Sequence, residues 1–270
     1  MSNVACKKAI GVFDSGLGGL TVVKEIIRLL PEEDVVYFGD VARLPYGNKS
    51  RETVVKFSVE NSLFLLSQGI KLLVVACNTA TALALEFLQS IFSIPVVGVV
   101  DPVVERVARM SPKEVAVIGT VSTIRSGVYQ SRLKKFGVFG VNAKACPLLV
   151  PTIEAGYVGK SICDEIIKYE IGPVLSKDTD LLLLACTHYP IIKKRIRTIF
   201  PSVRIVDSAV PTARAVKDLL EDYGMRKTRG IGKLRIFVSD MPNDFAVIAR
   251  RFLGKEMDDV TIRKVDHVLS

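Results

Sequence analysis

Short runs of consecutive apolar residues alternate along this 270-residue chain with longer stretches that have the periodicity of a helix. The runs are rich in Val, Ile and Leu and are apolar throughout, which is typical of parallel strands covered by helices on both faces. They predict nine strands, over residues 9–13, 35–39, 71–76, 95–100, 114–119, 141–145, 180–185, 203–207 and 233–239. Between them, segments 21–30, 51–69 and 212–224 have helical spacing, and the last two end at glycine. The sequence therefore predicts an α/β fold with mostly parallel sheets flanked by helices.

Two short sequence patterns each occur twice, which indicates two similar domains rather than one wide sheet. An apolar run followed by Ala-Cys occurs in LLVVACNTAT and again in LLLLACTHYP, and a strand followed by Asp-Ser occurs in VFDSG and again in VDSA. We expect a first domain of residues 1–98 completed by the C-terminal segment 210–270, and a second domain of residues 99–209. Ligands of open α/β sheets bind beyond the carboxyl ends of the strands, so the active site is expected in the cleft between the domains.

Composition excludes several classes of protein. Hydrophobic residues make up 49% of the chain, enough for a substantial core, and charged residues separate the apolar runs from one another. No run reaches the roughly 18 residues typical of a membrane span. The apolar stretch at the N-terminus is too short for a secretory signal, so we expect a cytoplasmic protein. The five cysteines are scattered and never spaced as CxxC, which argues against a disulfide framework and a structural zinc site.

The net charge of +9 is compatible with nucleic-acid binding or with a solvated surface. The densest basic segment, residues 226–235, can be a loop between a helix and a strand. No zinc-finger, RNP or helix-turn-helix signature accompanies it, so nucleic acid is not expected as a partner.

Cys77 and Cys186 each follow a predicted strand, and a helix is expected to begin directly after each. The N–H groups and dipole of a helix N-terminus lower the pKa of a thiol from about 8.5 and also bind carboxylates. Asn78, Thr79 and Thr187 add hydrogen-bonding groups beside the two thiols. A single cysteine at such a position is usually a buried core residue without a chemical role. Two cysteines in similar sequence segments favour a pair of reactive thiols.

His188 follows Cys186 by two positions. It can be a capping or partly buried histidine, or it can move a proton beside the thiol. No second close pair of ligands accompanies the Cys-x-His pair, so no metal is expected.

The stretch VFDSGLGGLTV places Asp14 and Ser15 at a strand end, before three glycines. It lacks the GK[ST] ending of a phosphate loop and does not match GxGxxG. Asp14 can cap the next helix, meet a substrate ammonium group or tune a thiol, and the sequence leaves these alternatives open.

Two more loops follow strands. DVARLPYGNKS, with Pro45, Tyr46 and Gly47 at its middle, is either a plain turn or a binding loop. IGTVSTIRSGVYQ supplies Thr120 and Thr123, either as helix-start residues or as ligand donors.

In these phrases the chain resembles the cofactor-independent glutamate racemases of bacteria. The matching segments are FDSGLGGLTV, PYGNKS, VVACNTATA, IGTVSTIRSGVYQ, ACPLLVPTIEAG, LLACTHYP and VDSA, which extend from residue 10 to about residue 209. Related aspartate and hydantoin racemases share the two cysteines but generally lack DSGxGG and PYG, so the glutamate assignment depends on those two phrases. The segment beyond residue 210 matches weakly.

The resemblance implies a role for each matched residue. Cys77 and Cys186 are similar to two catalytic acid/base thiols, with Asp14 assisting Cys77 and with His188 and Glu154 assisting Cys186. These residues, Glu154 excepted, would also contact the substrate, together with Ser15, Pro45, Tyr46, Gly47, Asn78, Thr79, Thr120, Thr123 and Thr187. Thr152 stands where the family usually has leucine. The resemblance further implies a homodimer that needs no cofactor and supplies D-glutamate for peptidoglycan.

Racemisation removes the α-proton from one face of the substrate and returns a proton to the other, which suits two thiols of opposite protonation. In the family's pattern, Cys77 acts on D-glutamate and Cys186 on L-glutamate. Without pyridoxal phosphate, the carbanionic transition state needs electrostatic stabilisation. If each sulfur stands at reacting distance from the α-carbon, the two sulfurs should lie roughly 6–7 Å apart.

Two other functions fit parts of the sequence. A binding protein with two closing α/β lobes would hold an amino acid without chemistry, but it would not explain the paired thiols. An aspartate racemase or a related α-carbon decarboxylase would use the same thiols on a different acid.

Overall fold

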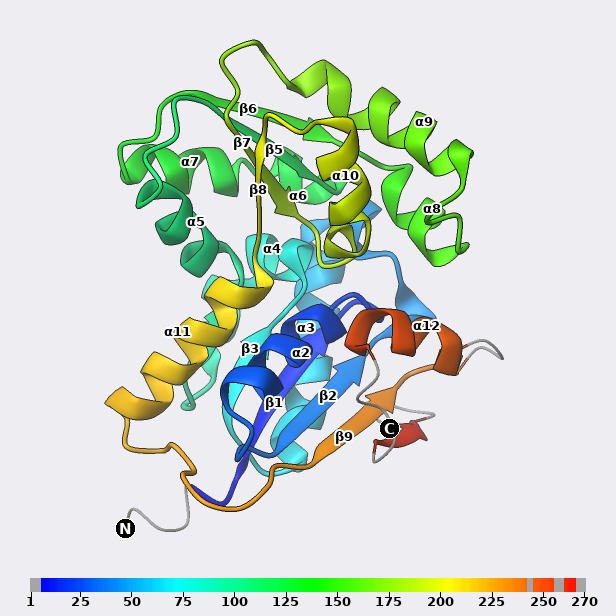
Figure 1. Cartoon of the computed structure of the whole chain (residues 1–270). Coiled ribbons are helices and arrows are strands. Elements are labelled where there is room, and N and C mark those ends of the chain that lie inside the picture. The colour runs from blue at the N-terminus through cyan, green and yellow to red at the C-terminus, as the bar shows by residue number, and fades with distance from the viewer. Residues whose placement is uncertain (1–5, 242–244, 255–259, 266–270) are drawn as a thin grey trace.

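Two parallel sheets form the frame of the computed structural model, which describes residues 6–241, 245–254 and 260–265 (Figure 1). The first sheet has the order β10-β9-β2-β1-β3-β4 and the second β6-β5-β7-β8. The first contains β1 (Ala9–Asp14), β2 (Val35–Gly39), β3 (Ile70–Val75), β4 (Val96–Gly98), β9 (Leu234–Val238) and β10 (Thr261–Lys264). The second contains β5 (Val115–Gly119), β6 (Val141–Ala145), β7 (Leu181–Ala185) and β8 (Arg204–Asp207). We call the two halves built on these sheets the first and second lobes.

Helices flank both sheets, as predicted (Figure 1). They are α2 (Leu20–Leu29), α3 (Arg51–Ser67), α4 (Asn78–Ile91), α5 (Val100–Ala108), α6 (Val121–Arg125), α7 (Val128–Lys135), α8 (Leu149–Glu154), α9 (Ser161–Ile171), α10 (Lys193–Ile199), α11 (Ala209–Asp222) and α12 (Phe245–Leu253). Short 3-10 turns are η1 (Val41–Arg43), η2 (Tyr46–Asn48), η3 (Gly172–Val174) and η4 (Tyr189–Ile192). The three helices predicted from periodicity are present as α2, α3 and α11.

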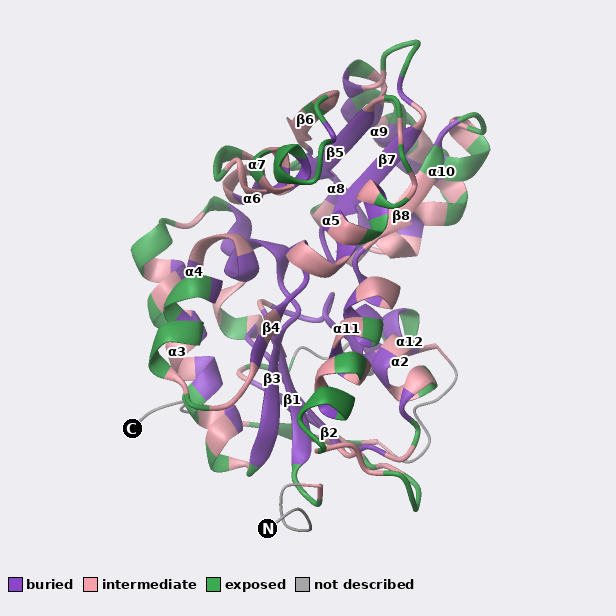
Figure 2. Cartoon of the chain, turned by 90° about the vertical axis from the view of Figure 1, so that its left-hand side faces the viewer, coloured by how far each residue is buried: buried purple, intermediate pink, exposed green. Residues whose placement is uncertain are grey.

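All nine predicted strands are present, and their recorded pairings are parallel. Strands β1, β2, β3, β5 and β7 are buried along their whole length, which is the cause of their unbroken apolar sequence (Figure 2). The edge strands β6 and β8 are only partly buried, so the expectation of full cover is wrong for them. Strand β10, with sequence TIRK, is mostly exposed and was not predicted.

The chain passes between the lobes twice, from β4 into α5 and from β8 into α11 (Figure 1). Helix α11 then packs against α2 of the first lobe and against α5. Strand pairing thus assigns β1–β4, β9 and β10 to one sheet and β5–β8 to the other, while the proposed division at residues 98 and 209 stays a prediction.

The basic segment, residues 226–235, lies mostly in the connection between α11 and β9, as expected for a loop between a helix and a strand. Across the described ranges, no helix is both long enough and apolar enough to cross a membrane.

Candidate active site

A small cavity between the lobes collects residues that follow β1, β3, β5 and β7. Its volume is about 30 Å³, room for no more than a few water molecules. It is lined by Ser15, Leu44, Pro45, Tyr46, Gly47, Cys77, Asn78, Thr79, Thr120, Val150, Cys186, Thr187 and His188. Both cysteine phrases therefore face one cavity.

Most of the predicted site residues line this cavity, and three lie behind the lining. Asp14 and Thr123 are fully buried and contact lining residues, and Glu154 contacts His188. Leu44 and Val150 line the cavity and were not predicted. Both lie inside matched or loop phrases, but an apolar side chain carries no chemical signal that would single it out.

Cys77 is the N-cap residue of α4, as the sequence predicts. Its sulfur accepts a hydrogen bond from the backbone N–H of Ala80 and lies 3.5 Å from the hydroxyl of Ser15. Burial and the nearby Asp14 carboxylate nevertheless raise the pKa of Cys77 to about 12. The prediction that the helix N-terminus lowers this pKa is wrong, because desolvation of the thiolate outweighs the hydrogen bonds. Cys77 is a protonated thiol at neutral pH.

Asp14 joins the first lobe to the second. One of its carboxylate oxygens accepts from the backbone N–H of Gly16 at 3.0 Å, and the other accepts from the Thr187 hydroxyl at 3.3 Å. Burial raises its pKa, while the positive charge of His188 and the backbone N–H groups act in the opposite direction. Asp14 does not cap α2, whose N-cap is Gly19 without a side-chain hydrogen bond. A Cβ at Gly19 would lie 2.5 Å from that of Asp14, so glycine is needed for this close approach.

Cys186 has a different environment from the one predicted. No helix begins directly after it, since η4 starts only at Tyr189, and the thiol is not an N-cap. Instead its sulfur lies 3.9 Å from Nδ1 of His188, whose Nε2 lies 2.9 Å from Glu154 Oε1. Burial would lower the pKa of His188, but the interactions with Cys186 and Glu154 raise it to about 10. His188 is therefore an imidazolium at neutral pH and stabilises negative charge on the Cys186 sulfur.

Two glycines, Gly18 and Gly47, allow the lobes to approach each other closely near the cavity. A Cβ at Gly18 would lie 2.3 Å from Thr187 Oγ1 and 2.5 Å from His188 Nδ1. A Cβ at Gly47 would lie 2.6 Å from that of Thr120. These distances are too short for any side chain, so both positions require glycine for the lobes to close.

Three threonine hydroxyls also bridge the lobes. The hydroxyl of Thr79, on α4, lies 2.9 Å from that of Thr120 and 3.1 Å from that of Thr123. Thr120 and Thr123 are 2.9 Å apart, and Thr120 also caps α6. Thr120 is therefore both a helix-start residue and a cavity residue. The two roles that the sequence offered for it, helix start and ligand donor, are compatible.

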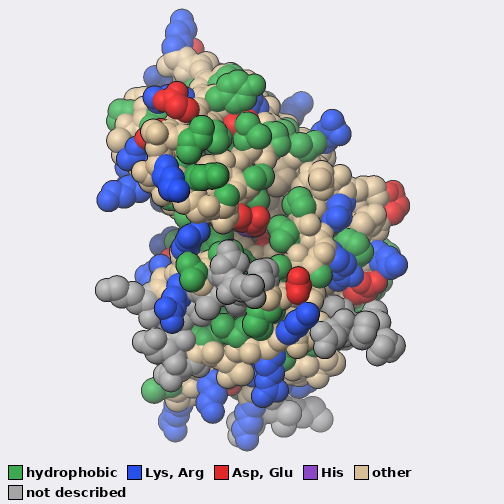
Figure 3. Space-filling view, turned by 90° about the vertical axis from the view of Figure 1, so that its right-hand side faces the viewer, with side chains coloured by type: hydrophobic (Ala, Val, Ile, Leu, Met, Phe, Trp, Pro, Cys, Tyr) green, Lys and Arg blue, Asp and Glu red, His purple; other side chains and the backbone are tan. Residues whose placement is uncertain are grey.

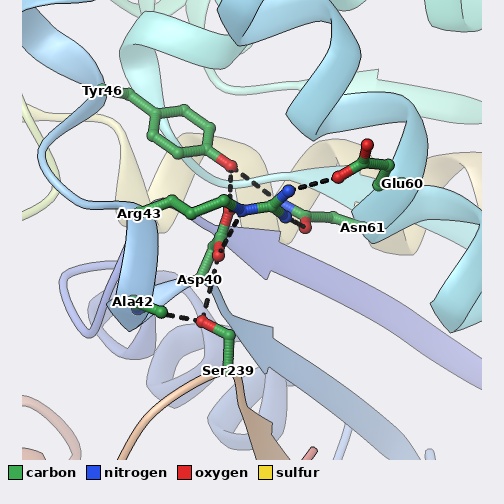
Figure 4. A network of polar contacts seen from close by, with 7 residues as sticks. All are labelled: Asp40, Ala42, Arg43, Tyr46, Glu60, Asn61 and Ser239. Carbon is green, nitrogen blue, oxygen red and sulfur yellow. Dashed lines mark hydrogen bonds and ion pairs between the residues drawn. The ribbon is translucent and has the colours of Figure 1, made fainter. Parts of the chain in front are cut away.

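The loop that carries Pro45, Tyr46 and Gly47 is fixed by a buried network (Figure 4). The Tyr46 hydroxyl donates to Asp40 and accepts from Asn61. Arg43 donates to the same carboxylate and to Glu60 and Asn61, and Ser239, just after β9, donates to Asp40 at 3.0 Å. The loop is thus a fixed wall of the cavity rather than a plain turn.

Within the described ranges, the cavity included, no group of three or more His, Cys, Asp or Glu residues is arranged to hold a metal ion. A larger hollow of about 310 Å³ lies among α5, β8 and α11. Its charged lining includes Arg106, Lys193, Asp207 and Arg214, but none of the predicted site residues.

Comparisons with known proteins find one matching family and several similar proteins. The family model described as Asp/Glu/Hydantoin racemase matches residues 10–216. The glutamate racemase of Geobacter metallireducens is 48% identical over 94% of this chain and 95% of that protein, and that of Aquifex aeolicus is 43% identical over 92% and 95%.

Solved structures show the same likeness. Glutamate racemase from Thermus thermophilus in complex with beta-chloro-D-alanine has a TM-score of 0.87 at 40% identity, covering 96% of this chain and 97% of that one. The Francisella tularensis enzyme in complex with D-glutamate has a TM-score of 0.90 at 37% identity, covering 97% and 99%. An aspartate racemase from Picrophilus torridus, at 21% identity and a TM-score of 0.56, covering 82% and 96%, shares the fold.

Proposed function

The chain belongs to the Asp/Glu/hydantoin racemase family, and we propose that it interconverts L- and D-glutamate with Cys77 and Cys186 as its two acid/base groups. The observation that carries this proposal is the single cavity lined by two thiols, each contributed by a different sheet. Such an enzyme is an amino-acid racemase and hence an isomerase.

With L-glutamate, the Cys186 thiolate takes the α-proton, forming an S–H bond as the Cα–H bond breaks. The released electron pair delocalises into the α-carboxylate. The Cys77 thiol then gives its proton to the opposite face of the carbon. The resting charges suit this direction, because Cys77 is protonated and His188 is positive beside Cys186. With D-glutamate the two thiols exchange roles.

The developing negative charge needs hydrogen-bond donors that are already in place. Asn78, Thr79, Thr120 and Thr187 line the cavity and carry such groups. Closure of the lobes around the substrate would exclude water, and this would strengthen each of these contacts. At about 30 Å³ the cavity is too small for glutamate, so the lobes must separate for the substrate to enter and close around it.

Deuterium exchange tests this function directly. The protein is incubated with L-glutamate in deuterated water, with no added cofactor, and the α-position is followed by NMR. We expect deuterated D-glutamate to accumulate, and we expect exchange with aspartate to be much slower. No exchange would indicate a binding protein, and faster exchange with aspartate would indicate an aspartate racemase.

Four further parts of the proposal concern the working form of the enzyme and its cellular setting. The enzyme works in the cytoplasm, needs no cofactor and supplies D-glutamate for peptidoglycan. It acts as a homodimer, and large apolar side chains exposed on α9 and just before α8 and α9 support this, among them Leu148, Tyr157, Ile162 and Tyr169. Figure 3, which views the molecule from the right-hand side of Figure 1, shows hydrophobic side chains gathered on the second lobe, at the top of the picture. Light scattering after size exclusion tests the homodimer, and a monomeric mass at assay concentration would contradict it.

A further inference from the structure

The side-chain amide of Asn78 has a buried nitrogen that makes no hydrogen bond within the described part of the chain. Asn78 directly follows Cys77, is 2% exposed and lines the cavity. Buried polar groups are nearly always hydrogen-bonded, so a buried donor beside a cavity is available to a ligand. A carboxylate oxygen of an amino acid is a suitable acceptor.

The orientation of this amide depends on one residue of the opposite lobe. The hydroxyl of Tyr129, on α7, donates to Oδ1 of Asn78 and makes no other hydrogen bond among the described residues. Tyr129 is 1% exposed, and burial raises its pKa above the ordinary value, so the hydroxyl remains a proton donor. With Oδ1 engaged by Tyr129, the NH₂ group has to face the other way.

We propose that Tyr129 is a positioning residue that turns the Asn78 NH₂ group toward a carboxylate of the substrate. The two residues come from different lobes, so their hydrogen bond forms only when the lobes are together. Closure of the cleft therefore sets the amide at the moment the substrate is enclosed. This inference rests on the proposed racemisation of glutamate.

The test is a double-mutant cycle. Tyr129→Phe removes the hydroxyl but keeps the buried ring. Without the hydroxyl the amide rotates freely and loses part of its hydrogen bond to the substrate, so we expect KM for both enantiomers to rise about ten-fold with little change in kcat. Asn78→Ala should raise KM at least as much. If Tyr129 acts through Asn78, Tyr129→Phe should have no further effect in the Asn78→Ala background.

Leu133→Val is the matched control, because Leu133 is buried on the same helix, carries no hydrogen-bonding group and does not line the cavity. It should lower the melting temperature while leaving KM unchanged. An unchanged KM in Tyr129→Phe, or an equal effect of Tyr129→Phe with and without Asn78, would overturn the proposal. A fall in kcat at constant KM would also overturn it.

A second measurement is made on the wild-type protein, and a variant serves only to assign its signals. The ¹⁵N–¹H signals of the Asn78 amide, assigned by their loss in Asn78→Ala, should shift when glutamate binds. Signals that do not move would contradict the contact. Wild-type protein that exchanges no α-hydrogen would refute the proposed function itself, whereas an active wild type with an unaffected Tyr129→Phe variant would refute only the role of Tyr129.

Discussion

The two sides of the cavity begin from the same sequence phrase and end with opposite electrostatics. Cys77 and Cys186 both follow an alanine at the end of a buried strand. Cys77 has the Asp14 carboxylate near it and a pKa of about 12, whereas Cys186 has the positively charged His188. The strand places each thiol, but the charged side chain beside it, Asp14 for Cys77 and His188 for Cys186, sets its electrostatic environment.

This asymmetry has a limited effect on the kinetics. The two enantiomers of glutamate have equal free energy, so kcat/KM must be the same in both directions. The difference between the two sides can therefore appear only in kcat and KM taken separately, and in the isotope effects of the individual proton transfers. Four predictions test the comparison.

Replacing either thiol should have the largest effect. Cys77→Ser and Cys186→Ser should each lower kcat/KM by about a thousand-fold or more in both directions, because a hydroxyl is a far weaker acid than a thiol and is not ionised near neutral pH to act as the base. Circular dichroism of the product measures the rate. Cys163→Ala is the control, since this buried cysteine does not line the cavity, and it should retain activity. Near-normal turnover in either serine variant would remove that thiol from the mechanism.

Removing the assisting groups should have an intermediate effect that distinguishes the sides. His188→Gln and Asp14→Asn should each lower kcat/KM about a hundred-fold, equally in both directions. With α-deuterated substrates, His188→Gln should increase the isotope effect mainly for L-glutamate and Asp14→Asn mainly for D-glutamate. The same change in both variants would show that the two sides are not distinct.

Adding a methyl group where the lobes meet should have a smaller effect. Gly18→Ala places a Cβ 2.3 Å from Thr187 Oγ1, so either the lobes close less or the contact is strained. We expect KM to rise and the free energy of unfolding to fall by about 1–3 kcal/mol. Gly172→Ala, with no atom within 4 Å of the added Cβ, is the control. Equal behaviour of the two variants would show that Gly18 is not a point of closure.

The pH dependence of stability should show the smallest effect. The folded-state pKa of His188, about 10, lies above its ordinary value of 6.5, so its stabilising contribution is complete below pH 6.5 and is lost as the pH rises toward 10. Between pH 6.5 and 9 the free energy of unfolding of the wild type should therefore fall relative to that of His188→Gln. Urea unfolding at several pH values measures this. Parallel curves for the two proteins would mean that His188 is neutral in the fold.

Sequence reasoning located the strands and the thiols because both leave a local pattern. Unbroken apolar runs predicted β1 and β7, and the matched Ala-Cys phrases indicated one shared cavity. The exposed polar strand β10 has no such pattern. The same is true of properties that depend on contacts between distant segments.

Cys77 and Tyr129 illustrate this limit. The N-cap position of Cys77 was predicted correctly, but its pKa depends on burial and on Asp14, more than sixty positions away. Tyr129 lay inside a matched phrase, yet its contact with Asn78 exists only because the lobes face each other. The spacing of these residues along the chain reveals neither the proximity of Asp14 to Cys77 nor the contact between Tyr129 and Asn78.

The double passage of the backbone between the lobes restricts how the molecule can open. Two rigid lobes joined by the backbone at two points retain one motion of low energetic cost, which is a rotation about the line through both connections. The short segments around Val99 and Ser208 then take up the change in backbone angles, and the opening swings rather than slides. The rate at which glutamate exchanges with solvent would accordingly depend on the stiffness of these few residues, none of which lines the cavity.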